Sequence, residues 1–387
     1  MSRLHEVTRR LPAAVAHREP EERARLVEAA SKGRHVVPRF SVLRVPVERA
    51  AFAVVDRARR LAEAHVAGAL YAARLDELEL DLAMMDALGD PRRVRPMSAR
   101  RFGRGSSLVW VHGREVTVRS VADELLAHLE PAPEKKTLPA RATAFGPSLE
   151  DLARRVAAIA GLDVEVRIEP RLVANAAAGE RTVFLADRWF GAREAVRLAV
   201  HEVLGHLVAA ANGRRQPLGL LATGTAGSFE DQEGLSILLE DRAGVLDAER
   251  LRILAGRVLA TDAMHEGASF GEAVRLLRDE HGFGVESAIT LAERAYRGGG
   301  IARDVVYLRG YLRVREAVET GTTTIDELRI GRVGLEALAL LETPRTHGWV
   351  LPPHHRPDLE TTLDRALLGA RLGRAAAFAR EPRRAFL

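Results

Sequence analysis

The sequence predicts an α+β fold that is mostly α-helical. Alanine and leucine are abundant and runs of β-branched residues are few, a composition that favours helices. Two strand-like segments, residues 163–169 and 181–186, precede a helical period over residues 194–211. From residue 230 onward the pattern is almost wholly helical. We therefore expect a small sheet beside one long helix, followed by further helices.

The chain has 387 residues, enough for two domains. Residues 1–40 are polar, rich in arginine and interrupted by prolines, and we expect a flexible arm there. Residues 41–130 predict a helical N-terminal region. Residues 131–147 contain several prolines without periodicity and predict a linker. Residues 148–387 would then form the second domain.

The N-terminal region divides further. Residues 47–88 predict two long helices that meet near residues 71–75. Residues 89–105 are punctuated by glycine and proline and predict a loop. A hairpin is expected over residues 107–118, turning at His112-Gly113, and a helix over residues 121–129.

Two signals mark helix ends in the second domain. Ser148, with the acidic Asp151 three residues later, predicts the N-cap of a helix over residues 149–159. Asn212-Gly213 is expected to end the long helix, because both residue types are common just after a helix C-terminus.

Composition excludes several classes of site. The chain has no cysteine, which excludes disulfides, thiolate metal sites and cysteine nucleophiles. Only three of its 58 basic residues are lysines, and the arginines alternate with acids along the helices. This alternation predicts ion-paired, solvated faces, and we expect no nucleic-acid partner. No apolar run approaches the roughly 20 residues of a membrane span, so we expect a soluble, cytoplasmic protein without a membrane partner.

The hexapeptide from His201 to His206 has the composition of a metal site. Zinc binds imidazole and carboxylate when thiolates are absent. However, residues five apart lie about 140° apart around a regular α-helix, so the two rings would diverge. A π-bulge would bring them into line, and Gly205 would ease that distortion by leaving the backbone free. We therefore expect a locally widened helix.

A third ligand is expected from the next helix. Glu233 lies near the start of the helical run over residues 235–239, and Gly234 would permit close approach of the two helices. Glu230 and Asp231 are competing ligand candidates. Glu233 could also be a simple capping acid near a positive helix end. Together with the histidine pair, the ligand interpretation is favoured.

These residues predict the chemistry of a zinc peptidase. Three protein ligands leave one zinc ion an open position for water, whose pKa the ion lowers. Glu202, next to the first ligand, is the expected general base that passes a proton to the leaving amine. Glu240 shares a helix face with Glu233 and could orient a ligand imidazole, although the sequence favours a solvated acid.

At this point the motifs resemble a known family. The hexapeptide, followed by Gln232-Glu233-Gly234-Leu235, resembles the microtubule-associated tyrosine carboxypeptidases, whose bacterial members carry a "QEGLA" motif. Ser236 stands where that motif ends in alanine. Residues 294–310 resemble the family's arginine-glycine turn and its "KD-x-x-YL-x-G" segment, with Arg303 in place of lysine. The likeness covers residues 145–345 and, more faintly, residues 77–88 and 98–105.

The resemblance implies a zincin- or gluzincin-like catalytic domain over residues 148–387, with zinc held by His201, His206 and Glu233. It also implies removal of a C-terminal aromatic residue, tyrosine or phenylalanine, from a peptide or protein. In the animal members that substrate is tubulin. The arginine-rich composition here is typical of a bacterial protein, so tubulin is not carried over.

A carboxypeptidase must bind a free carboxylate, for which an arginine fork is the natural partner. Within the segment that resembles the family, Arg297 and Arg309 are the candidates. Tyr307 is the candidate donor to the substrate or to the oxyanion.

Three alternatives remain at this stage. Dipeptidyl peptidase III enzymes share the histidine spacing, but their ligand glutamate lies much further downstream in a pair of consecutive glutamates, and this chain has no such pair downstream of its histidines. A non-catalytic zinc-binding regulatory protein would need a fourth ligand, for which His265, Glu266 and His281 are candidates. Nucleic-acid binding would show a steep salt dependence, and the dispersed arginines argue against it.

Overall fold

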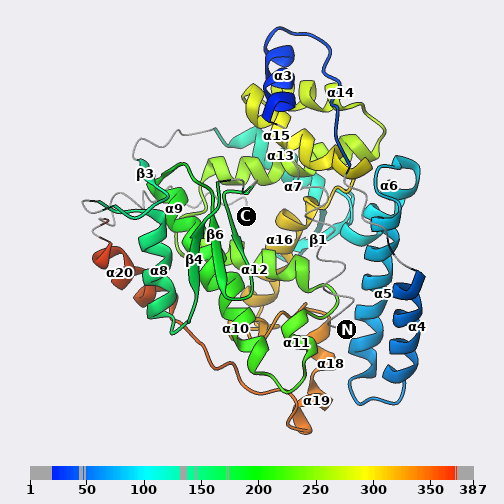
Figure 1. Ribbon diagram of the computed structural model, residues 1–387, viewed down its shortest axis with the longest axis vertical. Coiled ribbons are helices and arrows are strands. Elements are labelled where there is room, and N and C mark those ends of the chain that lie inside the picture. The colour runs from blue at the N-terminus through cyan, green and yellow to red at the C-terminus, as the bar shows by residue number, and fades with distance from the viewer. Residues whose placement is uncertain are drawn as a thin grey trace. The chain divides into compact units, whose positions relative to one another are not determined.

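Figure 1 shows the computed structural model of the protein. The structure describes residues 20–42, 47, 49–130, 137–143, 146–170, 172, 174–370 and 372. The chain divides into two compact units. The first contains the described residues of 1–130 and 249–309, and the second those of 131–248 and 310–385. The domain boundaries expected from the sequence stay a prediction.

The first unit is helical apart from one hairpin. Its elements are α3 (Pro20–Ser31), α4 (Arg49–Ala62), α5 (Gly68–Asp86), α6 (Pro91–Phe102), β1 (Leu108–Val111), β2 (Arg114–Thr117), α7 (Val118–His128), α13 (Ala248–His265), α14 (Phe270–Arg275), the π-helix η2 (Leu276–Glu280), α15 (Val285–Tyr296), the 3-10 turn η3 (Arg297–Gly299) and the start of α16 (Val305–Glu319).

The two helices predicted over residues 47–88 are present as α4 and α5. They pack through a core of Val55, Leu75, Leu78 and Leu82. The predicted junction near residues 71–75 is wrong, because those residues lie inside α5. The chain turns before Gly68 instead, where a Cβ atom would lie 2.4 Å from the Ala62 carbonyl oxygen, closer than any real contact.

The loop predicted over residues 89–105 is also wrong, because α6 occupies most of it. Asp90 caps this helix by accepting a hydrogen bond from the Arg92 amide at 3.0 Å. Pro91 takes the first helical position, where its missing N–H costs nothing. The Asp-Pro pair therefore starts a helix here, although the same pair is also common in loops.

The predicted hairpin is confirmed as β1 and β2, which pair antiparallel with Val111 opposite Arg114. The turn residues His112 and Gly113 both have positive φ, 50° and 73°. Two-residue turns of this hand match the right-handed twist of the strands. The helix predicted to follow is confirmed as α7.

Of the predicted N-terminal arm, residues 1–19 lie outside the described residues. Residues 20–31 form α3, in which Pro20 begins the helix. This helix packs on α15: Leu26 is fully buried, and Arg23 donates to Thr290 at 2.7 Å. This part of the segment is thus docked through both apolar and polar contacts.

The second unit contains the small sheets. Its elements are β3 (Thr137–Pro139), α8 (Leu149–Ile159), β4 (Glu165–Ile168), β5 (Ala176–Ala178), β6 (Thr182–Leu185), β7 (Trp189–Gly191), α9 (Ala192–Ala199), the π-helix η1 (Val200–Leu207), α10 (Val208–Arg215), α11 (Leu220–Thr223), α12 (Ser228–Arg242), the rest of α16, α17 (Ile325–Leu328), α18 (Ala337–Leu340), α19 (Glu342–Thr346) and α20 (Leu359–Gly369).

The sheet beside the long helix has the order β4-β6-β5. β4 and β6, the two strands predicted from the sequence, pair in parallel, and β5 runs antiparallel to β6. α8 packs on β4 and β6 (Figure 1), and its predicted cap is confirmed, since the Ser148 side chain accepts from the Asp151 amide at 3.0 Å. The strand β3, inside the predicted linker, pairs with β7.

The predicted long helix is present as the continuous run α9, η1 and α10, but its expected end is wrong. Asn212 and Gly213 lie inside α10, which reaches Arg215. The Asn212 amide donates to the carbonyls of Arg329 and His355, at 2.8 and 3.0 Å. A Cβ on Gly213 would lie 2.5 Å from a backbone oxygen of α11. Tertiary contacts therefore explain both residues.

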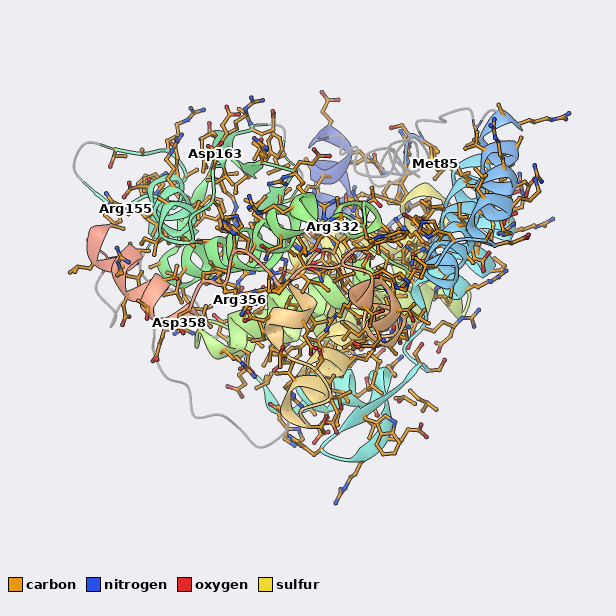
Figure 2. All side chains as sticks on the ribbon, turned by 90° about the horizontal axis from the view of Figure 1, so that it is seen from below. Met85, Arg155, Asp163, Arg332, Arg356 and Asp358 are labelled. Atoms are coloured by element: carbon orange, nitrogen blue, oxygen red, sulfur yellow. The ribbon has the colours of Figure 1, made fainter. Side chains whose placement is uncertain are left out.

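The arginines follow the predicted alternation with acids. On α8, Arg155, labelled in Figure 2, lies 2.7 Å from Asp151, and Arg154 lies 2.8 Å from Glu150. The two residues of each pair are four positions apart on a partly exposed face. Such pairs contribute at most about 1 kcal/mol each, so they solubilise the surface more than they stabilise it.

The chain is mostly helical with small sheets, as the sequence predicted. None of the helices in the described part combines the length and apolar composition that a membrane span requires.

Candidate metal centre

The histidine pair lies on η1, where the helix is widened as the sequence required. Backbone hydrogen bonds between residues five apart make a π-helix from Val200 to Leu207. The His201 and His206 rings consequently lie on one side, with centroids 4.9 Å apart. The predicted π-distortion is therefore confirmed, and it removes the geometric obstacle of the five-residue spacing.

Gly205 has a second role that the sequence did not reveal. A Cβ at this position would lie 2.1 Å from the Ser236 Oγ and 3.1 Å from the Ser236 Cα on α12. The glycine thus permits η1 and α12 to approach closely. Gly234, expected to serve this contact, instead faces α16, where its Cβ would lie 2.2 Å from the Gly310 carbonyl oxygen.

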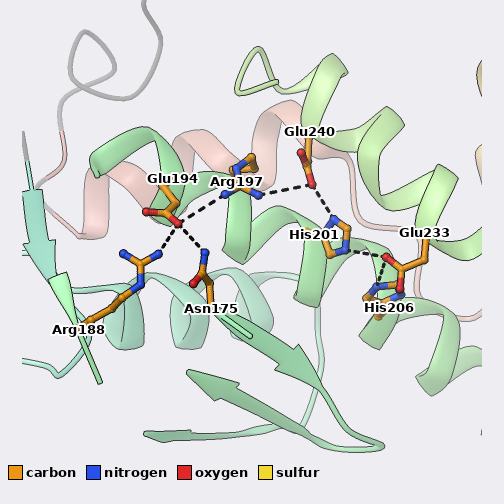
Figure 3. Close-up of polar contacts among 8 residues, drawn as sticks. All are labelled: Asn175, Arg188, Glu194, Arg197, His201, His206, Glu233 and Glu240. Carbon is orange, nitrogen blue, oxygen red and sulfur yellow. Dashed lines mark hydrogen bonds and ion pairs between the residues drawn. The ribbon is translucent and has the colours of Figure 1, made fainter. Parts of the chain in front are cut away.

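The close approach of α12 brings Glu233 to the histidines (Figure 3). Ligand atoms of His201, His206 and Glu233 all lie within 4.8 Å of one another. Glu233 Oε2 is 3.3 Å from His201 Nε2 and 3.7 Å from His206 Nε2. Tetrahedral zinc bonds of about 2.0–2.1 Å place donors about 3.3–3.4 Å apart, so the spacing fits such an ion.

Burial and charge hold this group together. Burial lowers the pKa of His201, but its hydrogen bonds to Glu233 and Glu240 prevail and raise it to about 9. Burial raises the pKa of Glu233, but the charges and hydrogen bonds of His206 and His201 prevail and hold it well below its ordinary value. The His206 side chain is 21% exposed, which leaves one side of the group open to solvent.

Glu240 is not the solvated acid that the sequence favoured. Its side chain is fully buried, and its Oε1 accepts a hydrogen bond from His201 Nδ1 at 2.7 Å. Glu233 and Glu240 are separated by two turns of α12, so both meet the same imidazole from one helix face. A carboxylate on the outer ring nitrogen fixes the orientation and tautomer of a ligand histidine.

The sequence also matches a family of known proteins. A sequence model of the microtubule-associated tyrosine carboxypeptidases matches residues 30–373, most of the chain. The chain belongs to this family. A search of curated proteins gave no match. Membership in the microtubule-associated tyrosine carboxypeptidase family implies a carboxypeptidase-like activity on a peptide or protein substrate.

The competing ligand candidates, Glu230 and Asp231, are not part of the group of potential metal ligands. Asp231 is buried, and its Oδ2 accepts from the Leu335 amide at 2.7 Å while Oδ1 lies 3.5 Å from Arg313 Nε. Burial raises the pKa of Asp231 to about 7. Among the described residues, neither Asp231 nor Glu230 joins the group of potential ligands.

Glu202, the predicted general base, follows the first histidine on η1 and is buried, with 7% of its surface exposed. The candidates for a fourth ligand, His265, Glu266 and His281, belong to the first unit. In the part of the chain that the structure describes, the group of potential metal ligands consists of His201, His206 and Glu233.

The predicted substrate-binding residues also belong to the first unit. Arg297 Nε donates to the Glu293 carbonyl at 3.0 Å, and Arg309 Nη1 donates to the Ser107 hydroxyl at 3.2 Å. The Tyr307 ring lies under the guanidinium of Arg257, at 4.4 Å from its centroid. Their proposed contact with substrate stays a prediction.

The family segment over residues 294–310 contains a structural ion pair that sequence reasoning missed. Asp304, 2% exposed, accepts two hydrogen bonds from Arg294, one of them at 2.8 Å from Nη2. Burial raises the pKa of Asp304, but the positive charges of Arg294 and Arg257 prevail and hold it below its ordinary range. The acid of the "KD" pattern thus ties α15 to the start of α16.

Proposed function

We propose that this chain is a zinc-dependent carboxypeptidase that removes a C-terminal aromatic residue, tyrosine or phenylalanine, from a peptide or protein. The observation that carries the proposal is the group of His201, His206 and Glu233 on η1 and α12, with zinc-compatible spacing, in a member of a carboxypeptidase family. A zincin-like arrangement of the catalytic domain belongs to the same proposal.

The donor set supports zinc. Two imidazoles and one carboxylate are a common catalytic zinc set, and three protein ligands leave a position for water. The fully buried Glu240 behind His201 matches the carboxylate–histidine pairing of such sites. When bound, zinc supplies a water of lowered pKa and polarises the scissile carbonyl.

Glu202 then acts as the general base. Its carboxylate accepts a proton from the attacking water as the oxygen adds to the carbonyl carbon. The same proton passes to the amide nitrogen as the C–N bond breaks, which releases the C-terminal residue as a free amino acid. Burial of Glu202 supports this role, because a proton acceptor shielded from bulk water returns its proton to the substrate.

Recognition of the free C-terminus is assigned to arginine. A guanidinium binds both oxygens of a carboxylate through parallel hydrogen bonds, and Arg297 and Arg309 are the proposed partners. Tyr307 is the proposed donor to the substrate or oxyanion. The chemistry requires a free carboxylate, so a peptide that ends in an amide should be a poor substrate.

A non-catalytic zinc protein is the alternative of a different class. A structural zinc site usually closes with four protein ligands, whereas three are found here among the described residues. An acid directly after the first ligand also has no purpose in a structural site. The dipeptidyl peptidase III alternative is disfavoured by the family match.

The decisive experiment compares the wild type with Glu202→Gln. Zinc content is measured on both proteins, and hydrolysis is followed on peptides ending in tyrosine, in phenylalanine, in alanine and in tyrosine amide. We expect one zinc ion in each protein and loss of turnover by at least about 10²-fold in the variant. A wild type that binds no zinc, or a variant that keeps its turnover, contradicts the proposal. Equal cleavage of the peptide that ends in alanine would contradict only the proposed specificity for a C-terminal aromatic residue.

A further inference from the structure

Behind the candidate ligand His201, charged side chains continue away from the metal centre (Figure 3). The carboxylate of Glu240 is fully buried, and burial of an anion is costly unless a cation compensates it. Arg197, on α9, places its Nη1 4.0 Å from Glu240 Oε1. The Arg197 side chain is only 13% exposed, so water screens this attraction weakly.

Arg197 is in turn held from its other side. Its Nη2 lies 3.7 Å from Oε1 of Glu194, one turn earlier on α9. The same oxygen of Glu194 accepts from Arg188 Nη2 at 2.6 Å and from Asn175 Nδ2 at 3.0 Å. Arg188 precedes β7 and Asn175 precedes β5, so segments beside the sheets fix the outer carboxylate.

Charge therefore alternates from the sheet segments to the ligand. Arg188 contacts Glu194, which contacts Arg197, and Arg197 contacts Glu240. Glu240 in turn accepts a hydrogen bond from the His201 ring N–H. Glu194, Arg197 and Glu240 each contact oppositely charged or hydrogen-bonding groups on two sides. These contacts restrict the positions that their side chains can adopt. These contacts connect the His201 imidazole, through Glu240, to residues outside the group of candidate ligands.

We propose that Arg197 and Glu194 are positioning residues of the metal centre, which hold Glu240 so that His201 presents Nε2 to the metal. This inference rests on the proposed function, because it assumes that the group binds zinc. Metal coordination tolerates distance errors of only about 0.2 Å, so a small rotation of one imidazole weakens binding.

The alternative is that Arg197 is only one more arginine of a charged helix. This alternative predicts a different effect of its substitution on the metal centre. The same helix supplies a matched control: Arg193 lies 3.3 Å from Asp247, and these side chains are 17% and 25% exposed. Arg193→Gln removes an ion pair of α9 that does not reach Glu240. Both variants lose an ion pair of this helix, but the pair with Asp247 is lost in Arg193→Gln and the pair with Glu240 in Arg197→Gln.

The experiment measures zinc affinity of the full chain by competition with a chromogenic chelator, for the wild type, Arg197→Gln, Arg197→Lys and Arg193→Gln. We expect Arg197→Gln to weaken zinc binding about tenfold, as loss of outer partners does in other zinc sites. Arg197→Lys, which keeps the charge, should recover part of that loss. Arg193→Gln should bind zinc as the wild type does.

A second readout uses the metal-free protein and does not depend on turnover. The Nδ1 proton of His201, hydrogen-bonded to Glu240, should give an NMR signal that shifts in Arg197→Gln and not in Arg193→Gln. If Arg197→Gln does not fold, Glu194→Gln tests the same relay from its more exposed end and should weaken zinc binding more than Arg193→Gln.

The outcomes separate the two proposals. A wild type without zinc affinity overturns the proposed function and this inference with it. A wild type that binds zinc, with Arg197→Gln or its substitute Glu194→Gln indistinguishable from Arg193→Gln, overturns the inference alone.

Discussion

Gly205→Ala tests how the metal centre is assembled. The added Cβ would lie 2.1 Å from Ser236 Oγ, 2.8 Å from Ser236 Cβ and 3.1 Å from Ser236 Cα. The hydroxyl can rotate away, but the Cα belongs to the backbone of α12. Ordinary carbon contacts are about 3.5–4.0 Å, so α12 must move away from η1 by several tenths of an ångström.

The magnitude follows from two opposing effects. Overpacking of this kind costs about 1–3 kcal/mol. Alanine favours a helix over glycine by about 1 kcal/mol, which offsets part of that cost. We expect a net loss of about 1 kcal/mol in the free energy of unfolding. Glu233 lies one turn before Ser236 on α12, so the same shift should also weaken zinc binding.

The assay combines urea unfolding of the metal-free protein with zinc competition, for Gly205→Ala, Ser236→Gly and the double variant. Ser236→Gly removes the two closest contacts, so the double variant should lose less stability than the sum of the singles, by about 1 kcal/mol. Gly219→Ala, with open space around the new Cβ, is the control. If Gly205→Ala is as stable as the wild type, or if the two losses simply add, the close-approach explanation is wrong and backbone freedom alone explains the glycine.

The remaining predictions concern single contacts. Glu240→Gln should weaken zinc binding by about 10–100-fold, measured by chelator competition, because the amide is a weaker acceptor for His201. Asp304→Asn should lower the free energy of unfolding by about 3–5 kcal/mol, since it removes the buried anion and leaves the part-buried Arg294 guanidinium without its partner. Because the pKa of Asp304 is held below its ordinary value, its contribution is complete above about pH 4 and is lost as the pH falls further, so the difference between wild type and Asp304→Asn in urea titrations should shrink in acid. Ser148→Ala should cost about 1 kcal/mol of unfolding free energy through loss of the α8 cap.

Much of the candidate site could be predicted because its signals are local. The composition of the hexapeptide and the five-residue spacing of its histidines together required a π-distortion, and η1 provides it. Glu233 was expected from a helix start soon after the histidines, and it meets both rings. In each case the relevant geometry lies within one helix or between helices that are close together in the sequence.

The burial of Glu240 and the approach of Arg197 to it could not be predicted from the sequence, because both depend on packing. An acid on a helix with other charges is usually solvated, and nothing local shows that α12 buries this one against η1. Likewise, Arg197 has the spacing of an ordinary i,i+3 pair with Glu194. Its approach to Glu240 becomes visible only when helices distant in sequence are placed together.

The same distinction separates correct from incorrect boundaries. Ser148 capped its helix as predicted, because a cap is a contact between neighbours in sequence. The prediction that Asn212 ends its helix was wrong, because its side-chain amide donates hydrogen bonds to carbonyls more than 100 residues away in the sequence.

By itself, the sequence determined the mostly helical α+β class, the strands β4 and β6, the widened helix and the three candidate ligands, since backbone propensity and residue spacing are properties of short segments. Only the tertiary structure decided that Gly205 serves the approach of α12, that Glu240 is buried behind His201, and that Asp304 is an internal ion partner. Burial and close approach arise between segments far apart in the chain, so a local sequence pattern does not indicate either of them.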